Sequence, residues 1–118
     1  MALATDRDAR KYFAHHVESV FGKDADLCGT DTGTIYARKL FAPGKNIVFS
    51  YASGHGSFII TLNNAHLIVA QRQDAVTMCE LSATLALLKS GDLAALKPNE
   101  SAILTAALVA KLQATVEQ

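Results

Sequence analysis

The chain has 118 residues, half of them hydrophobic and 19% charged, a composition typical of globular proteins and unlike that of disordered ones. Its length predicts one domain, residues 1–118, with a core that needs no disulfide or metal. The 11 acidic and 11 basic residues cancel, so bulk charge predicts no attraction to nucleic acid or to an anionic membrane.

The first residues and the two cysteines bear on location. The stretch MALATDRDARKY lacks the apolar run of a secretory signal, and no later run approaches the roughly 18 apolar residues of a membrane span. Cys28 and Cys79 form no CxxC or zinc-type spacing and suit the reduced thiols of the cell interior. We therefore expect a soluble cytoplasmic protein with neither a metal nor a cofactor.

Residues 6–21 have helical periodicity, and Gly22 is a suitable end for this helix. The polar side carries Asp8, Tyr12, His15 and Ser19. The apolar side, which we expect to face the core, carries Ala9, Phe13, His16, Val17 and Val20. The sequence thus predicts a helix that packs on the rest of the domain.

Residues 33–72 are predicted to form four strands of an antiparallel meander. Short runs of β-branched and aromatic residues alternate here with the turn sequences APGK, SGHG and NN. Asn63-Asn64 is predicted as a two-residue turn, with Ile60 opposite Leu67 and Phe58 opposite Val69. Gly54-His55 is predicted as a second such turn, with Gly54 at positive φ. Both turns predict one core face: Ile47, Phe49, Tyr51, Phe58, Ile60, Leu62, Leu67 and Val69. For Pro43-Gly44, a three-residue loop with a bulge is as compatible as a two-residue turn.

After Arg72 the pattern becomes helical again. Thr77-x-x-Glu80 resembles a capping box, although a start near Ser82 would leave residues 75–79 as a fifth strand. Pro98-Asn99 is predicted to open a last helix that runs to about Thr115. Its leucine ridge (Leu104, Leu108, Leu112) suits a sheet, and its alanine ridge (Ala102, Ala106, Ala110, Ala114) suits another helix or a subunit contact.

The residues that suggest chemistry are better explained by structure. Ser53-Gly54-His55-Gly56-Ser57 lacks the strand-turn-helix context of a nucleophile elbow and is predicted as a hairpin bend. His15 and His16 project about 100° apart on a helix and cannot share one ion without help. The stretch DADLCGTD starts like an EF-hand loop but has Cys28 at a position that should supply oxygen. We expect a polar loop there, and we expect Cys79 in the core.

The predicted register also defines the second face of the sheet. Val48 aligns there with Thr61 and His66, and Ser50 with Ile59 and Ile68. Such a face is too apolar for ordinary solvent contact, and a second copy or a helix of the same chain are equally good covers. The predicted partner-binding residues are Val48, Ile59, His66 and Ile68, with Arg38 and Arg72 at the margins.

We therefore expect an α+β domain with an N-terminal helix, a meander sheet of four or five strands, and two C-terminal helices. The preferred function is a non-enzymatic protein-interaction module, such as a regulator, adaptor, inhibitor or immunity-type protein, that acts as a homodimer. The alternative is a small-molecule-binding domain or small enzyme with a pocket between sheet and helices. Its candidate polar groups are Cys28, Tyr36, Arg38 and His66.

Overall fold

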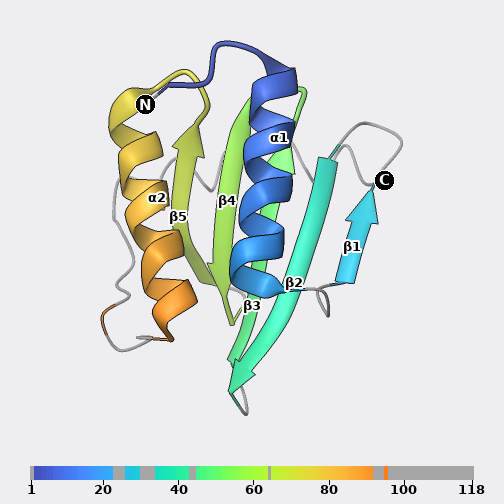
Figure 1. The fold of residues 1–118 in the computed structure, drawn as a ribbon, viewed down its shortest axis with the longest axis vertical. Coiled ribbons are helices and arrows are strands. Elements are labelled where there is room, and N and C mark those ends of the chain that lie inside the picture. Colours follow the sequence, from blue (N-terminus) through green and yellow to red (C-terminus); the bar gives the residue numbers. More distant parts are fainter. Residues whose placement is uncertain are drawn as a thin grey trace.

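The computed structural model describes residues 2–22, 26–29, 34–42, 45–63, 65–91 and 95. They form an α+β fold (Figure 1). Along the chain, an N-terminal helix comes first, the strands of an antiparallel sheet follow, and a second helix comes after them. The predicted fold class is confirmed at this level. The predicted last helix, with its leucine and alanine ridges, lies outside the described residues.

Helix α1 (Asp6–His16) continues into the short π-helical segment η1 (Val17–Phe21), as the periodicity of residues 6–21 predicts. Thr5 caps the start of α1, because its Oγ1 accepts a hydrogen bond from the Asp8 backbone N–H at 3.1 Å. Gly22 ends η1 with a φ of 75°, a conformation that glycine adopts at little cost. The buried side consists of Ala9, Phe13, Val17, Val20 and Phe21.

The sheet contains five described strands in the order of the sequence: β1 (Asp26–Gly29), β2 (Thr34–Ala42), β3 (Lys45–Ala52), β4 (Ser57–Leu62) and β5 (Ala65–Gln71). The predicted polar loop at DADLCGTD is therefore wrong for residues 26–29, because these pair with β2 at the sheet edge, and the rest of the stretch lies outside the described residues. The β2–β3 ladder reaches Ala42 opposite Lys45, with a bulge between Leu40 and Ala42. The bulge is a feature of one of the two predictions, and the predicted turn at residues 43–44 lies outside the described residues.

The register of β3 and β4 is the predicted one, with Phe49 opposite Ile60 and Tyr51 opposite Phe58. The connection between these strands differs from the two-residue turn. The strands end at Ala52 and Ser57, and residues 53–56 form a four-residue loop. The positive φ of 63° lies at Gly56, so the predicted type II′ geometry at Gly54 is wrong.

The register of β4 and β5 starts as predicted and then shifts. Asn63 has a φ of 50°, as the predicted turn requires, and Leu62 pairs with Ala65. A bulge then places Ile60 opposite Ile68 instead of Leu67, and Ile59 opposite Val69. This register moves Ile68 to the side of the sheet that carries Ile60, so its predicted place on the second face is wrong.

Helix α2 (Ala75–Ser90) includes residues 75–79, which excludes the predicted alternative of a fifth strand there. Its N-cap is Asp74, whose side chain accepts a hydrogen bond from the Val76 N–H at 3.2 Å. The predicted capping box at Thr77 is therefore wrong. Thr77 Oγ1 instead accepts from the Gln71 N–H at 3.1 Å, which joins the helix to the end of β5.

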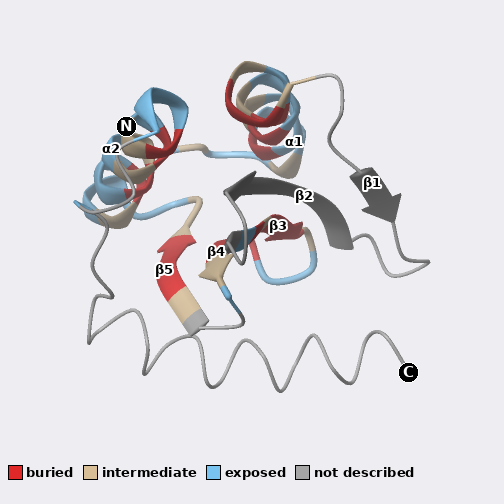
Figure 2. Cartoon of the chain, turned by 90° about the horizontal axis from the view of Figure 1, so that it is seen from below, coloured by how far each residue is buried: buried red, intermediate tan, exposed pale blue. Residues whose placement is uncertain are grey.

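Helices α1 and α2 lie side by side on one face of the sheet (Figures 1 and 2). Aromatic rings fill the layer below α1: Phe13 contacts Phe49 with ring centroids 4.7 Å apart, and Phe21 stacks parallel to Phe49. The buried residues of α2 are Met78, Leu81, Leu85 and Leu88. On the second face of the sheet, Ile59 and Val69 are also buried, at 2% and 3% exposure in the single chain.

Candidate functional site

Polar side chains gather at one end of the sheet, where three segments distant in sequence meet. These are the N-terminal segment with the first turn of α1, the β3–β4 loop, and the residues that follow β5. Backbone hydrogen bonds join them: the Leu3 N–H donates to the Arg72 carbonyl at 2.6 Å, and the Arg72 N–H donates to the Gly56 carbonyl at 2.8 Å. Backbone hydrogen bonds therefore hold the three segments together independently of their side chains.

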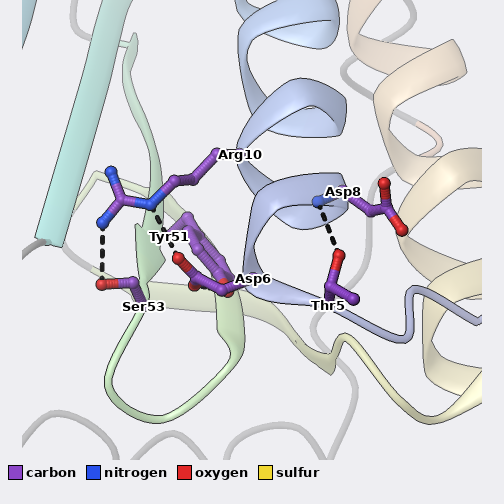
Figure 3. A network of polar contacts seen from close by, with 6 residues as sticks. All are labelled: Thr5, Asp6, Asp8, Arg10, Tyr51 and Ser53. Carbon is purple, nitrogen blue, oxygen red and sulfur yellow. Dashed lines mark hydrogen bonds and ion pairs between the residues drawn. The ribbon is translucent and has the colours of Figure 1, made fainter.

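Asp6 is the centre of a hydrogen-bonded network at this end (Figure 3). Its carboxylate accepts from the Tyr51 hydroxyl at 2.5 Å and from Arg10 Nε at 2.8 Å. The Nη2 of Arg10 reaches further, to Ser53 Oγ at 3.1 Å. Figure 3 shows the Arg10 guanidinium between Asp6 and Ser53, so the network ties α1 to the end of β3 and its loop.

The network shifts the pKa values of its two acids in opposite directions. Burial acts to raise the pKa of Asp6, but hydrogen bonds from Tyr51 and Arg10 and the charges of Arg10 and Arg72 bring it below its usual value. Burial and the adjacent Asp6 carboxylate raise the pKa of the Tyr51 hydroxyl. Tyr51 therefore stays protonated and donates to Asp6, which is the arrangement of a structural contact.

Beside this network lies a hollow with a volume of about 200 Å³. It is lined by Ser53, Gly54, His55 and Gly56 of the β3–β4 loop and by Gln71, Arg72 and Gln73. Arg72 Nη1 donates to the carbonyls of Leu3 and Ala4 at 3.1 and 2.7 Å, which holds the guanidinium in place. The side chain of Arg72 passes close to Gly56, where an added Cβ would lie 3.1 Å from Arg72 Cγ.

The SGHGS loop has the geometry of a bend, as predicted. His55 is exposed, whereas the hydroxyls of the two serines in the loop form hydrogen bonds with other residues. Ser57 Oγ donates to Gln71 Oε1 at 3.1 Å or to the His55 carbonyl at 3.4 Å, and Ser53 Oγ accepts from Arg10. The loop therefore does not present a serine to the histidine as a nucleophile and base require.

A second polar cluster lies at the seam between α1 and α2. The Tyr12 hydroxyl and Ser82 Oγ are 2.9 Å apart, and the Tyr12 ring contacts His16 with centroids 4.3 Å apart. Burial raises the pKa of Tyr12, and burial together with His15 and Lys89 lowers the pKa of His16. His16 is partly buried, as predicted, and its neutral form is the one that this seam favours.

The predicted partner-binding residues do not share one exposed surface. Ile59 and Ile68 are buried in the single chain, whereas Val48 and His66 are partly exposed. Arg72 lies at the hollow, away from the centre of the sheet. For Arg38 and Tyr36 of β2 and for Cys28 of β1, only the backbone positions are described.

The sequence interpretation missed the outer face of α2. Cys79, predicted in the core, is exposed, because it follows Met78 by about 100° around the helix and so turns away from the sheet. Val76 is 67% exposed, and Ala83 and Ala86 are exposed as well. We call Val76, Cys79, Ala83 and Ala86 the outer face of α2. The composition of residues 75–90 indicates such a face, because this helix includes only two charged side chains.

Two further findings concern the part of the chain that the structure describes. No three or more histidine, cysteine, aspartate or glutamate side chains gather there as a possible metal site. No helix in these ranges has the length and apolarity needed to cross a bilayer. Comparisons with protein families, curated proteins and solved structures found no match to the chain.

Proposed function

We propose that this protein is a non-enzymatic interaction module that forms a homodimer through the outer face of α2. The observation that carries the proposal is the composition of this face. A helix on a protein surface normally has charged or polar residues on the side away from the core. Here the exposed residues include the charged Glu80 and Lys89, but Val76, Cys79, Ala83 and Ala86 form an uncharged row along that side. Figure 2 shows that the side of α2 away from the sheet is exposed.

A second copy suits this face for two physical reasons. Small side chains such as Ala83 and Ala86 allow two helix backbones to approach closely, and an identical face on the partner offers the same small residues. A two-fold axis needs only one such self-complementary surface. The chain also carries equal numbers of acidic and basic residues, so its net charge does not oppose association of two copies.

The polar clusters support a non-enzymatic function. Among the residues that the structure describes, the groups with shifted pKa values are Asp6, Tyr12, His16 and Tyr51. Tyr51 and Asp6 bind each other, and Tyr12 binds Ser82 and packs on His16. The first contact joins α1 to β3 and the second joins α1 to α2. Burial is the largest influence on each of these pKa values, so a structural function explains the shifts. A cytoplasmic location belongs to the same proposal, because an exposed free thiol at Cys79 suits a reducing compartment.

The second face of the sheet has a smaller part in this proposal than the sequence suggested. Ile59 and Ile68 are already buried without a partner, so burying them cannot drive association. Val48, His66 and Arg38 stay predicted partner contacts on this face, whereas Arg72 lies at the hollow. The small-molecule alternative is favoured by the hollow between residues 53–56 and 71–73, at the edge of the domain. This hollow is not between the sheet and the helices, where the alternative predicts a pocket, because rings such as Phe13 and Phe49 fill the layer below α1.

Light scattering at several protein concentrations tests the homodimer. We expect a dimer for the natural sequence and a monomer for Ala83→Glu, because two glutamates would be forced together without solvent. Ala14→Glu is the matched control, since Ala14 is an exposed alanine within α1. A monomeric natural protein, or equal effects of both substitutions on the dimer, would contradict the proposal.

A further inference from the structure

The hollow at the end of the sheet has a lining rich in hydrogen-bond donors. Its seven residues include an arginine, a histidine and two glutamines, and no aspartate or glutamate. Gln71 Oε1 accepts from Ser57 Oγ, which leaves the two N–H groups of the Gln71 amide for another acceptor. An uncharged apolar ligand would leave these donors unpaired, whereas a ligand with several oxygens would satisfy them.

Arg72 is held in place before any ligand binds. Its Nη1 donates to the carbonyls of Leu3 and Ala4, and its own backbone bonds to Leu3 and Gly56. The N–H groups of Nε and Nη2 are those left to bind a further acceptor. Two N–H groups of one guanidinium suit the paired oxygens of a carboxylate or phosphate.

The charges around the hollow also favour an anion. Arg10 and Arg72 both lie close enough to Asp6 to lower its pKa. The Asp6 carboxylate is bound to Tyr51 and to Arg10 Nε. The next carboxylate along the chain from the hollow, Asp74, accepts a hydrogen bond from the Val76 N–H at the start of α2. Figure 3 shows the side chain of Asp8 turned away from Ser53 and Arg10, so it does not add negative charge beside the loop.

We propose that the hollow lined by residues 53–56 and 71–73 binds a small oxyanion, a carboxylate or a phosphate group, with Arg72 as its main ligand. Gln71 contributes its amide, and His55 and Gln73 lie at the exposed rim. Gly56 is part of the site, because a side chain there would push against Arg72. The proposal concerns a different surface from the outer face of α2 and does not depend on the homodimer.

The test is a titration of ¹⁵N-labelled protein with sodium phosphate and, separately, with sodium acetate, at ionic strength held constant with sodium chloride. We expect saturable shifts of the Arg72 Nε–H, the Gln71 side-chain amide and the Gly54 amide with at least one anion. The anion that saturates identifies the oxyanion. Absence of a saturable shift with both anions would overturn the proposal.

Variants separate a specific site from bulk charge. Arg72→Gln should weaken binding by about tenfold or more, because it removes a charge-assisted pair of hydrogen bonds. Lys11→Gln, at an exposed position on α1, removes the same charge and should leave the affinity unchanged. Equal weakening in both variants would overturn the proposal.

A second pair of variants keeps the test valid if Arg72→Gln does not fold. Gln73→Ala removes an exposed rim amide, and Gly56→Ala moves Arg72 without changing the charge. We expect both folded variants to bind the anion more weakly than the natural protein. Full affinity in both variants would show that the hollow is not the binding site.

Discussion

Helices α1 and α2 lie on the same face of the sheet and bury similar rows of apolar residues, but their solvent sides differ. The exposed side of α1 carries charged residues such as Arg7, Asp8 and Lys11. The exposed side of α2 has two charged residues, Glu80 and Lys89, and its centre is the row Val76, Cys79, Ala83 and Ala86. The buried rows explain how both helices attach to the sheet. They do not explain why the outer face of α2 has small and apolar residues where α1 has charged ones.

The largest expected effects come from the buried rows that the two helices share. Phe13→Ala in α1 should lower the free energy of unfolding by about 3–5 kcal/mol, and Leu85→Ala in α2 by about 2–5 kcal/mol. Both side chains are at most 2% exposed, so each truncation leaves a cavity. Urea unfolding measures both variants. A loss below about 0.5 kcal/mol for either one, the range of surface substitutions, would show that its helix is not attached through this core.

The hydrogen bond between the two helices should contribute less. Tyr12→Phe removes the hydroxyl that lies 2.9 Å from Ser82 Oγ and should cost about 0.5–1.5 kcal/mol. A double-mutant cycle with Ser82→Ala, followed by urea unfolding, isolates the pair. Additive losses in the double variant would contradict a direct contact between the helices at this point.

Asp6 should make stability depend on pH at the α1 end of the molecule. Its pKa is lower in the folded protein than the ordinary 3.8, so the unfolded chain binds the proton more tightly. The contribution is therefore present above about pH 4 and is lost as the pH falls through the folded value. Asp6 and Arg10 are both 42% exposed, so solvent screening limits the effect to about 0.2–1 kcal/mol. Urea unfolding of Asp6→Asn should show a weaker pH dependence there, and an unchanged dependence would contradict this account.

The smallest expected effect on stability is on the solvent sides themselves. Ala83→Glu in α2 and Ala14→Glu in α1 should each change the stability of the isolated chain by no more than about 0.5 kcal/mol. Thermal unfolding at low protein concentration measures this directly. A large loss for Ala83→Glu alone would mean that its effect on association reflects damage to the fold.

Much of the fold could be predicted because local patterns agree with one another. The β3–β4 register followed from turn residues and from alternation around Phe49 and Ile60, and the structure has that register. The shift in β5 could not be predicted, because residues 67–70 are all apolar and a one-residue shift places an apolar side chain on either face. Strand β1 was missed because a short edge strand of four residues resembles a polar loop.

The candidate sites were less predictable than the fold. Tyr51 and Asp6 are 45 residues apart in sequence, and no local pattern indicates that they meet. Arg72 was expected at the margin of a sheet face, whereas its backbone contacts with Leu3 and Gly56 bring it to the hollow. The sequence predicts a core position for Cys79 because Met78 and Leu81 beside it are apolar, but the turn of the helix between Met78 and Cys79 places the thiol on the outer face of α2.

The reactivity of the Cys79 thiol tests the central claim most directly, because this thiol lies on the outer face of α2 and is exposed in the single chain. A Cys28→Ser variant leaves Cys79 as the only cysteine, and its rate of modification by a thiol reagent is measured over a series of protein concentrations. We predict that the rate falls as the dimer forms, as followed by light scattering on the same samples. A dimer in which Cys79 stays as reactive as in the monomer would contradict the account, and so would a protein that stays monomeric throughout.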